Sequence, residues 1–235
     1  MQNSRFLIIA ILLCSYRLAE AQIGLGGFSG VMTIPTARML ADKHVALGVG
    51  YMPKPYALYE GSEHDNLTYF AAFGFLPFAE ISLRATRSSE SRHPSIGDRV
   101  ANIRLQILAE TPHRPGVTIG LHDVIALLER KNGSNNWFTA SYIVATKKTA
   151  LSKRFAVDAT LGYGVDWITA VSHEFDHLFG GVSIGVNDLL FFKGEYDAKR
   201  FNYGVGCHLY KFLSANLVFM DGKKAAFGAN LRKRL

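Results

Sequence analysis

Apolar and polar side chains alternate with a period of two along most of this chain, and this pattern constrains the fold more than any other feature. In residues 66–75, for example, Leu67, Tyr69, Ala71 and Phe73 share one face, while smaller or polar residues hold the alternate positions. Successive side chains of a strand point to opposite faces, so the pattern predicts strands rather than helices. It recurs in twelve segments, residues 44–51, 66–75, 78–85, 99–108, 116–122, 137–146, 155–164, 178–186, 190–198, 201–209, 213–219 and 225–231.

Most of these segments approach the about 9–11 residues of a tilted membrane-spanning strand. Charged side chains such as Arg84 and Arg104 stand in mid-segment on the polar face, which suits a polar lumen behind a lipid-facing exterior. The first eight segments are joined alternately by long and short connections, as in outer-membrane barrels. We therefore predict an all-β protein whose residues 44–235 form a membrane antiparallel up-and-down β-barrel of about 12 strands. A secreted soluble β-sandwich binding protein, which would bury the apolar face, is the alternative.

The N-terminus has the three parts of a secretory signal peptide. Arg5 precedes a short apolar run at 6–13, and an A-x-A cleavage signal ends at Ala21. The run is too short to span a bilayer as a helix, which needs about 20 residues. We expect residues 1–21 to direct export and to be removed by cleavage. Lipidation of Cys14 is the competing interpretation.

Residues 22–43, which precede the first predicted strand, are rich in glycine and lack the alternation. The stretch GLGGFSGVMTIPTARML at 24–40 combines flexible backbone with a proline, which does not favour a strand. Residues 36–40 are long enough for one helical turn. Such a segment either fills the lumen as a plug or forms a lead outside it. The plug candidates are Gly27, Gly30, Pro35, Thr36 and Arg38.

Seven charged residues are candidates for lining the lumen, because they fall on or beside the polar register of the predicted strands. They have two interpretations: they line a path for a polar polymer, or they form ion pairs and hydrogen bonds that hold a plug. The second is favoured because buried charges must be paired. The seven are Glu80, Arg84, Arg104, Asp158, Lys193, Glu195 and Asp197.

His173-Glu-Phe-Asp-His177 matches the H-E-x-x-H motif of zinc hydrolases, in which both histidines bind the metal and Glu174 acts as general base. That chemistry needs the motif on a helix, whereas the barrel places it in a loop that enters a strand. In extended backbone the two histidines would lie about 13 Å apart, too far to chelate one ion. We therefore expect no enzyme, no metal and no cofactor, with a zinc-dependent hydrolase as the alternative.

Lysine and arginine outnumber aspartate and glutamate by 26 to 19, which gives a formal net charge of +7. No long basic block appears before the last residues, so we expect no nucleic-acid partner. Hydrophobic residues make up 49% of the chain and charged residues 19%, a balance that excludes disorder. The two cysteines, Cys14 and Cys207, are too few for a disulfide scaffold.

Several short motifs resemble the YjbH family of outer-membrane proteins linked to exopolysaccharide production. The resemblance implies a barrel in the outer membrane of a Gram-negative bacterium. It also implies a role in exopolysaccharide export, secretion or surface assembly. Its implied partners are outer-membrane lipid, polysaccharide and other envelope export proteins. The chain is shorter than long family members, which implies one barrel unit. The matching residues are 27–30, 34–38, 78–84, 120–123, 145–147, 161–164, 179–181 and 195–197.

Overall fold

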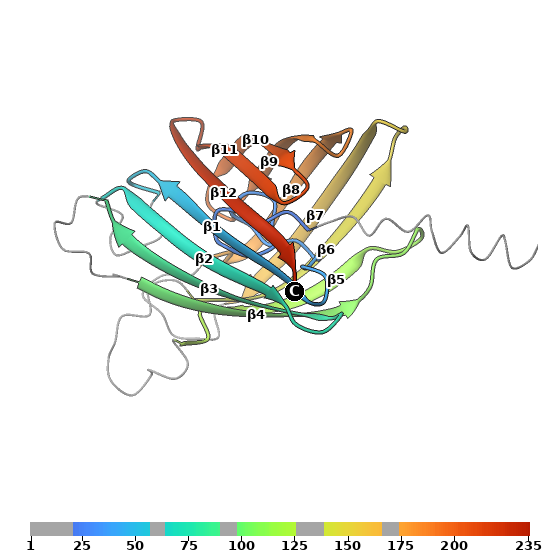
Figure 1. Ribbon diagram of the computed structural model, residues 1–235, viewed down its shortest axis with the longest axis horizontal. Helices are drawn as coiled ribbons and strands as arrows, with labels where there is room; N and C mark the ends of the chain where they lie inside the picture. Colours follow the sequence, from blue (N-terminus) through green and yellow to red (C-terminus); the bar gives the residue numbers. More distant parts are fainter. Residues whose placement is uncertain (1–20, 57–63, 90–97, 126–138, 166–173) are drawn as a thin grey trace, which may run out of the picture.

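Twelve antiparallel strands form a closed barrel in the computed structural model, which describes residues 21–56, 64–89, 98–125, 139–165 and 174–235 (Figure 1). Each strand pairs with its neighbours in sequence, and β1 pairs with β12 to close the sheet. The predicted fold class is confirmed, and the β-sandwich alternative is wrong. The strands are β1 (His44–Met52), β2 (Asn66–Gly74), β3 (Ala79–Ser88), β4 (Asp98–Leu108), β5 (Gly116–His122), β6 (Ala140–Ala150), β7 (Phe155–Val165), β8 (His177–Val186), β9 (Leu190–Tyr196), β10 (Phe201–Tyr210), β11 (Leu213–Met220) and β12 (Lys224–Arg234).

Three strands differ most from their predicted bounds. β3 was expected over residues 78–85 and runs over Ala79–Ser88. β6 was expected over residues 137–146 and instead runs to Ala150, because Lys147–Ala150 continue the ladder with β7. β12 extends to Arg234, since its last residues pair with the start of β1. Basic side chains lie near the ends of β6 and β12, and they are tolerated there because strand ends meet water rather than hydrocarbon.

The alternation separates an inner from an outer register. On β2, Thr68 and Phe70 are buried inside the barrel, whereas Tyr69 and Phe73 face outward and are exposed. Closure of the sheet leaves no hydrogen-bonding edge, so every strand can lie in a hydrophobic surrounding. No helix among the described residues is long and apolar enough to cross a membrane.

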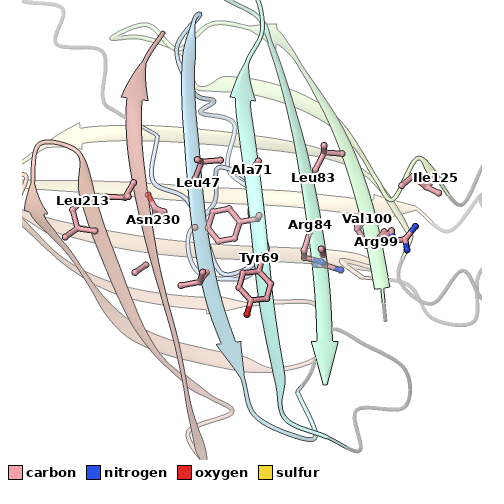
Figure 2. A pocket seen from close by; sticks show the side chains of 16 residues that line it. Leu47, Tyr69, Ala71, Leu83, Arg84, Arg99, Val100, Ile125, Leu213 and Asn230 are labelled. Atoms are coloured by element: carbon pink, nitrogen blue, oxygen red, sulfur yellow. The ribbon is translucent and has the colours of Figure 1, made fainter. Parts of the chain in front are cut away.

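An apolar groove of about 800 Å³ crosses the outside of the wall around β12, β1, β2 and β3 (Figure 2). Leu47 and Leu83 border it from the outward register, and each is about half exposed. Contiguous apolar surface of this extent is unfavourable in water and marks a surface made for hydrocarbon or another apolar partner.

The two ends of the barrel differ in their connections. The end where β1 begins and β12 finishes has short turns at residues 75–78, 151–154, 187–189 and 211–212, and one longer turn at 109–115. The opposite end carries the connections 53–65, 89–97, 123–139 and 166–176, followed by two short ones. Short turns at one end and long loops at the other are typical of outer-membrane barrels.

Residues 21–43 run inside the barrel before they enter β1 (Figure 1). Phe28, Met32 and Ile34 are almost fully buried there and form a core with inward residues of the wall, such as Val144 and Val218. Residues 36–40 contain no helix, contrary to the turn considered from sequence. The segment is therefore an irregular chain whose backbone polar groups must be satisfied by the wall.

Gly27 shows why this segment needs glycine. Its φ is +81°, a left-handed conformation that side chains rarely adopt, and a Cβ added there would come within 2.6 Å of Phe70 on β2. Glycine thus lets the chain turn against the aromatic ring. We use the word plug below for residues 21–43.

Candidate functional site

The carboxylate of Glu80, on β3, is the first of two deep anchors for the plug. It accepts hydrogen bonds from the backbone N–H of Ser29 (3.0 Å), from the Ser29 hydroxyl and from the N–H of Leu40 (2.8 Å). Arg104 pairs with it from β4 at 2.9 Å, and both side chains are essentially inaccessible to solvent. A buried carboxylate is tolerated only when paired and hydrogen-bonded, and the plug supplies most of these bonds.

Arg104 completes this anchor by binding plug carbonyl groups. Its guanidinium donates to the carbonyl oxygens of Ser29 (2.9 Å), Thr36 and Arg38 (3.3 Å). It also lies 6.0 Å from the centre of the Phe28 ring. One arginine therefore ties three points of the plug to one wall of the lumen.

Glu195, on β9, is the second deep anchor and binds a different part of the plug. Its carboxylate accepts from the backbone N–H groups of Met32 and Thr33, both at 2.9 Å, and from the Thr33 hydroxyl. Asn202, on β10, donates to the same carboxylate at 3.3 Å. Successive backbone N–H groups that point to one anion form an anion-binding site. Here the plug supplies the N–H groups and the wall supplies the anion.

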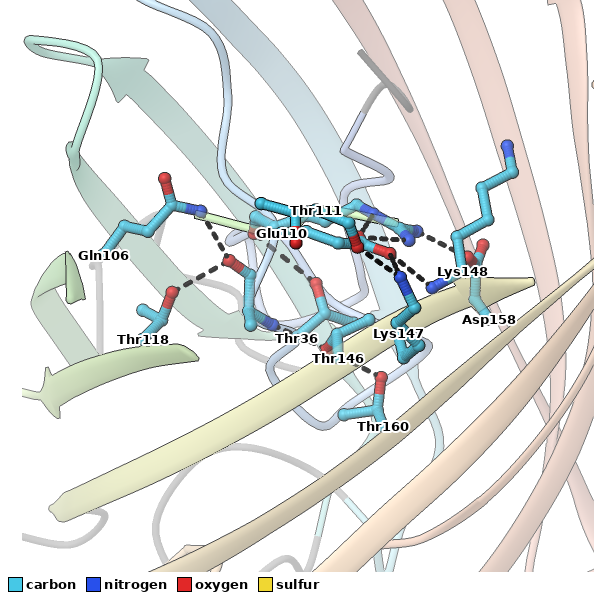
Figure 3. A network of polar contacts seen from close by, with 12 residues as sticks. Thr36, Gln106, Glu110, Thr111, Thr118, Thr146, Lys147, Lys148, Asp158 and Thr160 are labelled. Carbon is cyan, nitrogen blue, oxygen red and sulfur yellow. Dashed lines mark hydrogen bonds and ion pairs between the residues drawn. The ribbon is translucent and has the colours of Figure 1, made fainter. Parts of the chain in front are cut away.

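Polar groups on neighbouring strands extend this second anchor. Lys193 donates to the carbonyl of Val31 (2.9 Å) and to Asn216 on β11 (2.7 Å). Asn216 in turn donates to the carbonyl of Ile23 at 3.1 Å. On the other side of the lumen, the hydroxyls of Thr118 and Thr146 bind the carbonyl and N–H of Ala37 (Figure 3).

A third set of contacts lies near the mouth where β1 begins. Arg38 of the plug pairs with Glu110 at 2.9 Å and with Asp158 at 2.7 Å, and these side chains are 14–21% exposed (Figure 3). Burial lowers the pKa of Arg38, but the two carboxylates outweigh that effect and raise it. Arg38 therefore stays charged. Its ion pairs at the mouth are formed by side chains that are partly exposed to water.

An aromatic cluster fills the lumen toward the loop end. Phe175, from the connection before β8, is buried with its ring centre 6.1 Å from Phe28, 5.8 Å from Tyr142 and 5.5 Å from Phe179. Gly164 permits this approach, because a Cβ there would collide with the Phe175 carbonyl. Sequence analysis assigned no structural role to Phe175.

The neighbour of Phe175 contacts a histidine inside the barrel. Glu174 lies 3.0 Å from His122 on β5. Burial raises the pKa of Glu174, but the contact with His122 and the charge of Arg84 outweigh it, so the pKa lies below its ordinary value. Glu174 therefore contacts His122 of the barrel wall, and it does not stand in the position of a general base beside a bound metal.

The H-E-x-x-H motif of the hydrolase alternative is only partly described. His173 lies outside the described residues, and His177 is mostly exposed and pairs with Asp176 at 2.9 Å. Among the described residues, no group of three or more histidine, cysteine or acidic side chains could hold a metal ion.

Six of the seven lumen candidates point inward, and five of them belong to the contacts above. The sixth, Arg84, is buried and lies 3.6 Å from Asp98. Asp197 is the exception: it lies beyond β9, in the turn to β10, where it accepts from the backbone N–H groups of Lys199 and Arg200. Its other carboxylate oxygen accepts from the buried Asn202 at 3.1 Å, and its role in lining the lumen stays a prediction.

All five plug candidates lie inside the barrel. Gly27 turns against Phe70, and Gly30 and Pro35 form an isolated bridge with each other. Thr36 and Arg38 bind Arg104 through their carbonyl groups. The residues that sequence analysis missed are other members of the contacts between plug and wall: Ser29, Glu110, Thr118, Thr146 and Asn216.

Together, the wall and its contents define the class of protein as a β-barrel with an apolar exterior and a lumen filled by its own N-terminal segment. The family model described as "Exopolysaccharide biosynthesis protein YbjH" matches residues 24–183. The chain therefore belongs to this YjbH family, as its motifs indicated. The matched region includes plug residues 24–43 and both wall residues of the first anchor, Glu80 and Arg104.

Other comparisons are more distant. A solved structure titled "KdgM porin" is 8% identical, with a TM-score of 0.47, over 82% of this chain and 99% of that one. No curated protein matches the chain.

Proposed function

We propose that this protein is a non-enzymatic barrel of the Gram-negative outer membrane that takes part in exopolysaccharide export, secretion or surface assembly. The observation that carries the proposal is the hydrogen-bonding of the lumen charges to the plug. Glu80, Arg104, Lys193 and Glu195 all bind plug backbone groups. The lumen is thus occupied by a structural segment rather than by a reaction site.

Two features of the wall support a membrane location. The outward register presents large apolar side chains around the barrel, which suits lipid contact. The connection lengths are also asymmetric, so we assign the short-turn end to the periplasm and the long-loop end to the cell surface. Export across the inner membrane by the predicted signal peptide is consistent with this orientation.

The packing argues for a gated or partner-binding role instead of a permanently open pore. A polymer could enter this lumen only if the plug moved, because buried plug side chains and anchored backbone occupy it. Displacing the plug strips Glu80 and Glu195 of most of their hydrogen bonds, which is costly until water or another ligand replaces them. We therefore expect plug movement to require a partner or a ligand.

A deletion strain tests the proposed function. We expect loss of this gene to reduce secreted exopolysaccharide and expect the wild-type gene to restore it. Detergent-extracted outer membranes should contain the protein in a heat-modifiable form. Unchanged exopolysaccharide in the deletion strain, or a protein found soluble in the periplasm, would contradict the proposal.

A further inference from the structure

One end of the apolar groove on the outside of the wall carries two neighbouring arginines. Arg99 lines the groove at the start of β4, beside Ile125 (Figure 2). Its cross-strand partner on β3 is Ala85, and Arg87 stands two residues further along β3 on the same outward face. Diagonal neighbours of this kind lie about 7–8 Å apart. The two guanidinium groups can therefore contact one ligand at the end of the groove.

The positive charge of this pair is uncompensated. Neither guanidinium forms an ion pair within the part of the chain that the structure describes. The Nε of Arg87 is also buried without a hydrogen-bond partner. A buried donor without an acceptor is unfavourable, and two like charges side by side repel each other. An anion between the two side chains would remove both costs.

The carboxylates next to these strand ends have other partners. Asp65 accepts hydrogen bonds from the Tyr51 hydroxyl (2.6 Å) and from the backbone N–H of Lys54 (2.9 Å). Asp98 lies on the inward register and pairs with Arg84 at 3.6 Å. The outward register of the described strands contains no carboxylate. A second copy of the chain, docked wall to wall, would therefore bury both arginines unpaired, which is costly.

We propose that the groove binds an anionic lipid of the outer leaflet, with acyl chains along the groove and a phosphate between Arg87 and Arg99. The groove, bordered by Leu47 and Leu83, suits hydrocarbon, and the planar arginine fork suits phosphate oxygens. The inference rests on the proposed function through the orientation of the barrel. In that orientation the ends of β3 and β4 that carry the arginines lie at the cell surface, at the level of the lipid headgroups.

Native mass spectrometry of the full chain in detergent micelles tests the site. The probe is lipid A, a phosphorylated glycolipid with several acyl chains. Phosphatidylcholine, which has no net charge, is the control for the acyl chains, and inorganic phosphate is the control for the charge. We expect one lipid A to stay bound to each barrel at concentrations at which phosphatidylcholine does not. Inorganic phosphate should neither bind nor displace the lipid.

Paired charge removals locate the headgroup. Arg87→Gln with Arg99→Gln should weaken lipid A binding by about tenfold or more, the scale expected when charge contacts of a bound anion are lost. Lysine at both positions keeps the charge but not the planar fork, and should give an intermediate affinity. The matched control is Lys153→Gln with Arg154→Gln, which removes the same charge from an exposed turn at the opposite end. It should leave the affinity unchanged.

A second variant tests the groove without changing its charge. Ala71 lies between its cross-strand partners Leu47 and Leu83 on the outward face. Ala71→Trp should therefore fill the groove and weaken lipid A binding, while both arginines remain. Because this side chain points away from the lumen, the plug and its anchors are untouched. Every variant is first checked for the heat-modifiable mobility of a folded barrel.

Several outcomes would overturn the site. They are equal binding of phosphatidylcholine, displacement of lipid A by inorganic phosphate, unchanged affinity in the Arg87/Arg99 glutamine variant or in Ala71→Trp, or an equal loss in the control. If deletion of the gene reduces secreted exopolysaccharide while lipid A does not bind, this inference fails and the proposed function stands. If lipid A binds through the two arginines while exopolysaccharide is unchanged in the deletion strain, the lipid site stands and the proposed function fails.

Discussion

The plug is held in two physically different ways, deep in the lumen and at its mouth. Glu80 and Glu195 are at most 4% exposed and accept several hydrogen bonds from plug backbone and hydroxyl groups. Arg38 instead meets Glu110 and Asp158 through side-chain ion pairs that remain partly solvated. A buried anion that loses its donors stays unpaired until water enters the lumen, whereas the mouth contacts can exchange directly with water or a ligand. The deep anchors should therefore hold the plug in place, and the plug should detach from the wall first at the mouth.

The largest effect is expected from Glu80→Gln. The change leaves Arg104 without its carboxylate and points an amide toward plug N–H groups. Breaking a buried ion pair by removing one partner costs about 3–5 kcal/mol. We expect the free energy of unfolding in detergent micelles to fall by that amount, measured from heat-modifiable mobility against urea. A loss no larger than that of a mouth variant would remove the distinction between the two regions.

Glu110→Gln supplies the matched change at the mouth. Asp158 still faces Arg38 in this variant, and the lost ion pair is partly solvated. We expect a loss of about 1–2 kcal/mol in the same urea titration, between the values for exposed and for buried ion pairs. The plug should nevertheless become more accessible to protease at residues 38–43. A loss equal to that of Glu80→Gln would show that the mouth is as rigid as the deep lumen.

The Glu174–His122 contact predicts a smaller, pH-dependent effect at the loop end. The pKa of Glu174 is lower in the folded protein, so its ionisation stabilises the fold at pH values above the ordinary glutamate pKa. This contribution is lost as the pH falls below about 4.3 and through the lowered value. We expect the wild type to lose stability on acidification more steeply than Glu174→Gln does. Parallel pH profiles of the two proteins would refute the contact.

His177→Ala should have the smallest effect. The imidazole is 73% exposed, and substitutions at such positions usually change stability within about 0.5 kcal/mol. Because we propose no enzyme, the variant should secrete exopolysaccharide normally and bind as much zinc as the wild type. Stoichiometric zinc that is lost in His177→Ala would instead support the hydrolase alternative.

The barrel was predictable because alternate residues of a strand face opposite sides of the wall, so the sequence alternates between residues suited to the lumen and residues suited to the exterior. Tyr69 and Phe70, adjacent in the chain, lie outside and inside the wall as their positions require. The inward charges Glu80 and Arg104 followed from the same register. The end of β9 was predicted two residues too late, because the polar alternation continues past Tyr196, whereas hydrogen bonds of the turn end the strand there.

The course of the plug was not predictable to the same degree. Its residues show no periodicity, and their partners lie far away in sequence: Thr33 binds Glu195, 162 positions further on. Glycine and proline content indicated an irregular segment but not the anchors that hold it. Phe175 was missed for a similar reason, because a single aromatic residue in a loop gives no sign that it folds into the lumen.

Single-channel recording in planar bilayers tests the central claim that the plug closes the barrel. The comparison is between the full chain and a variant that lacks residues 24–40, both shown to be folded by heat-modifiable mobility. We predict no stable conductance steps for the full chain and clear steps for the deletion, since removing the segment opens a water-filled lumen. Equal conductance of the two proteins would contradict the account.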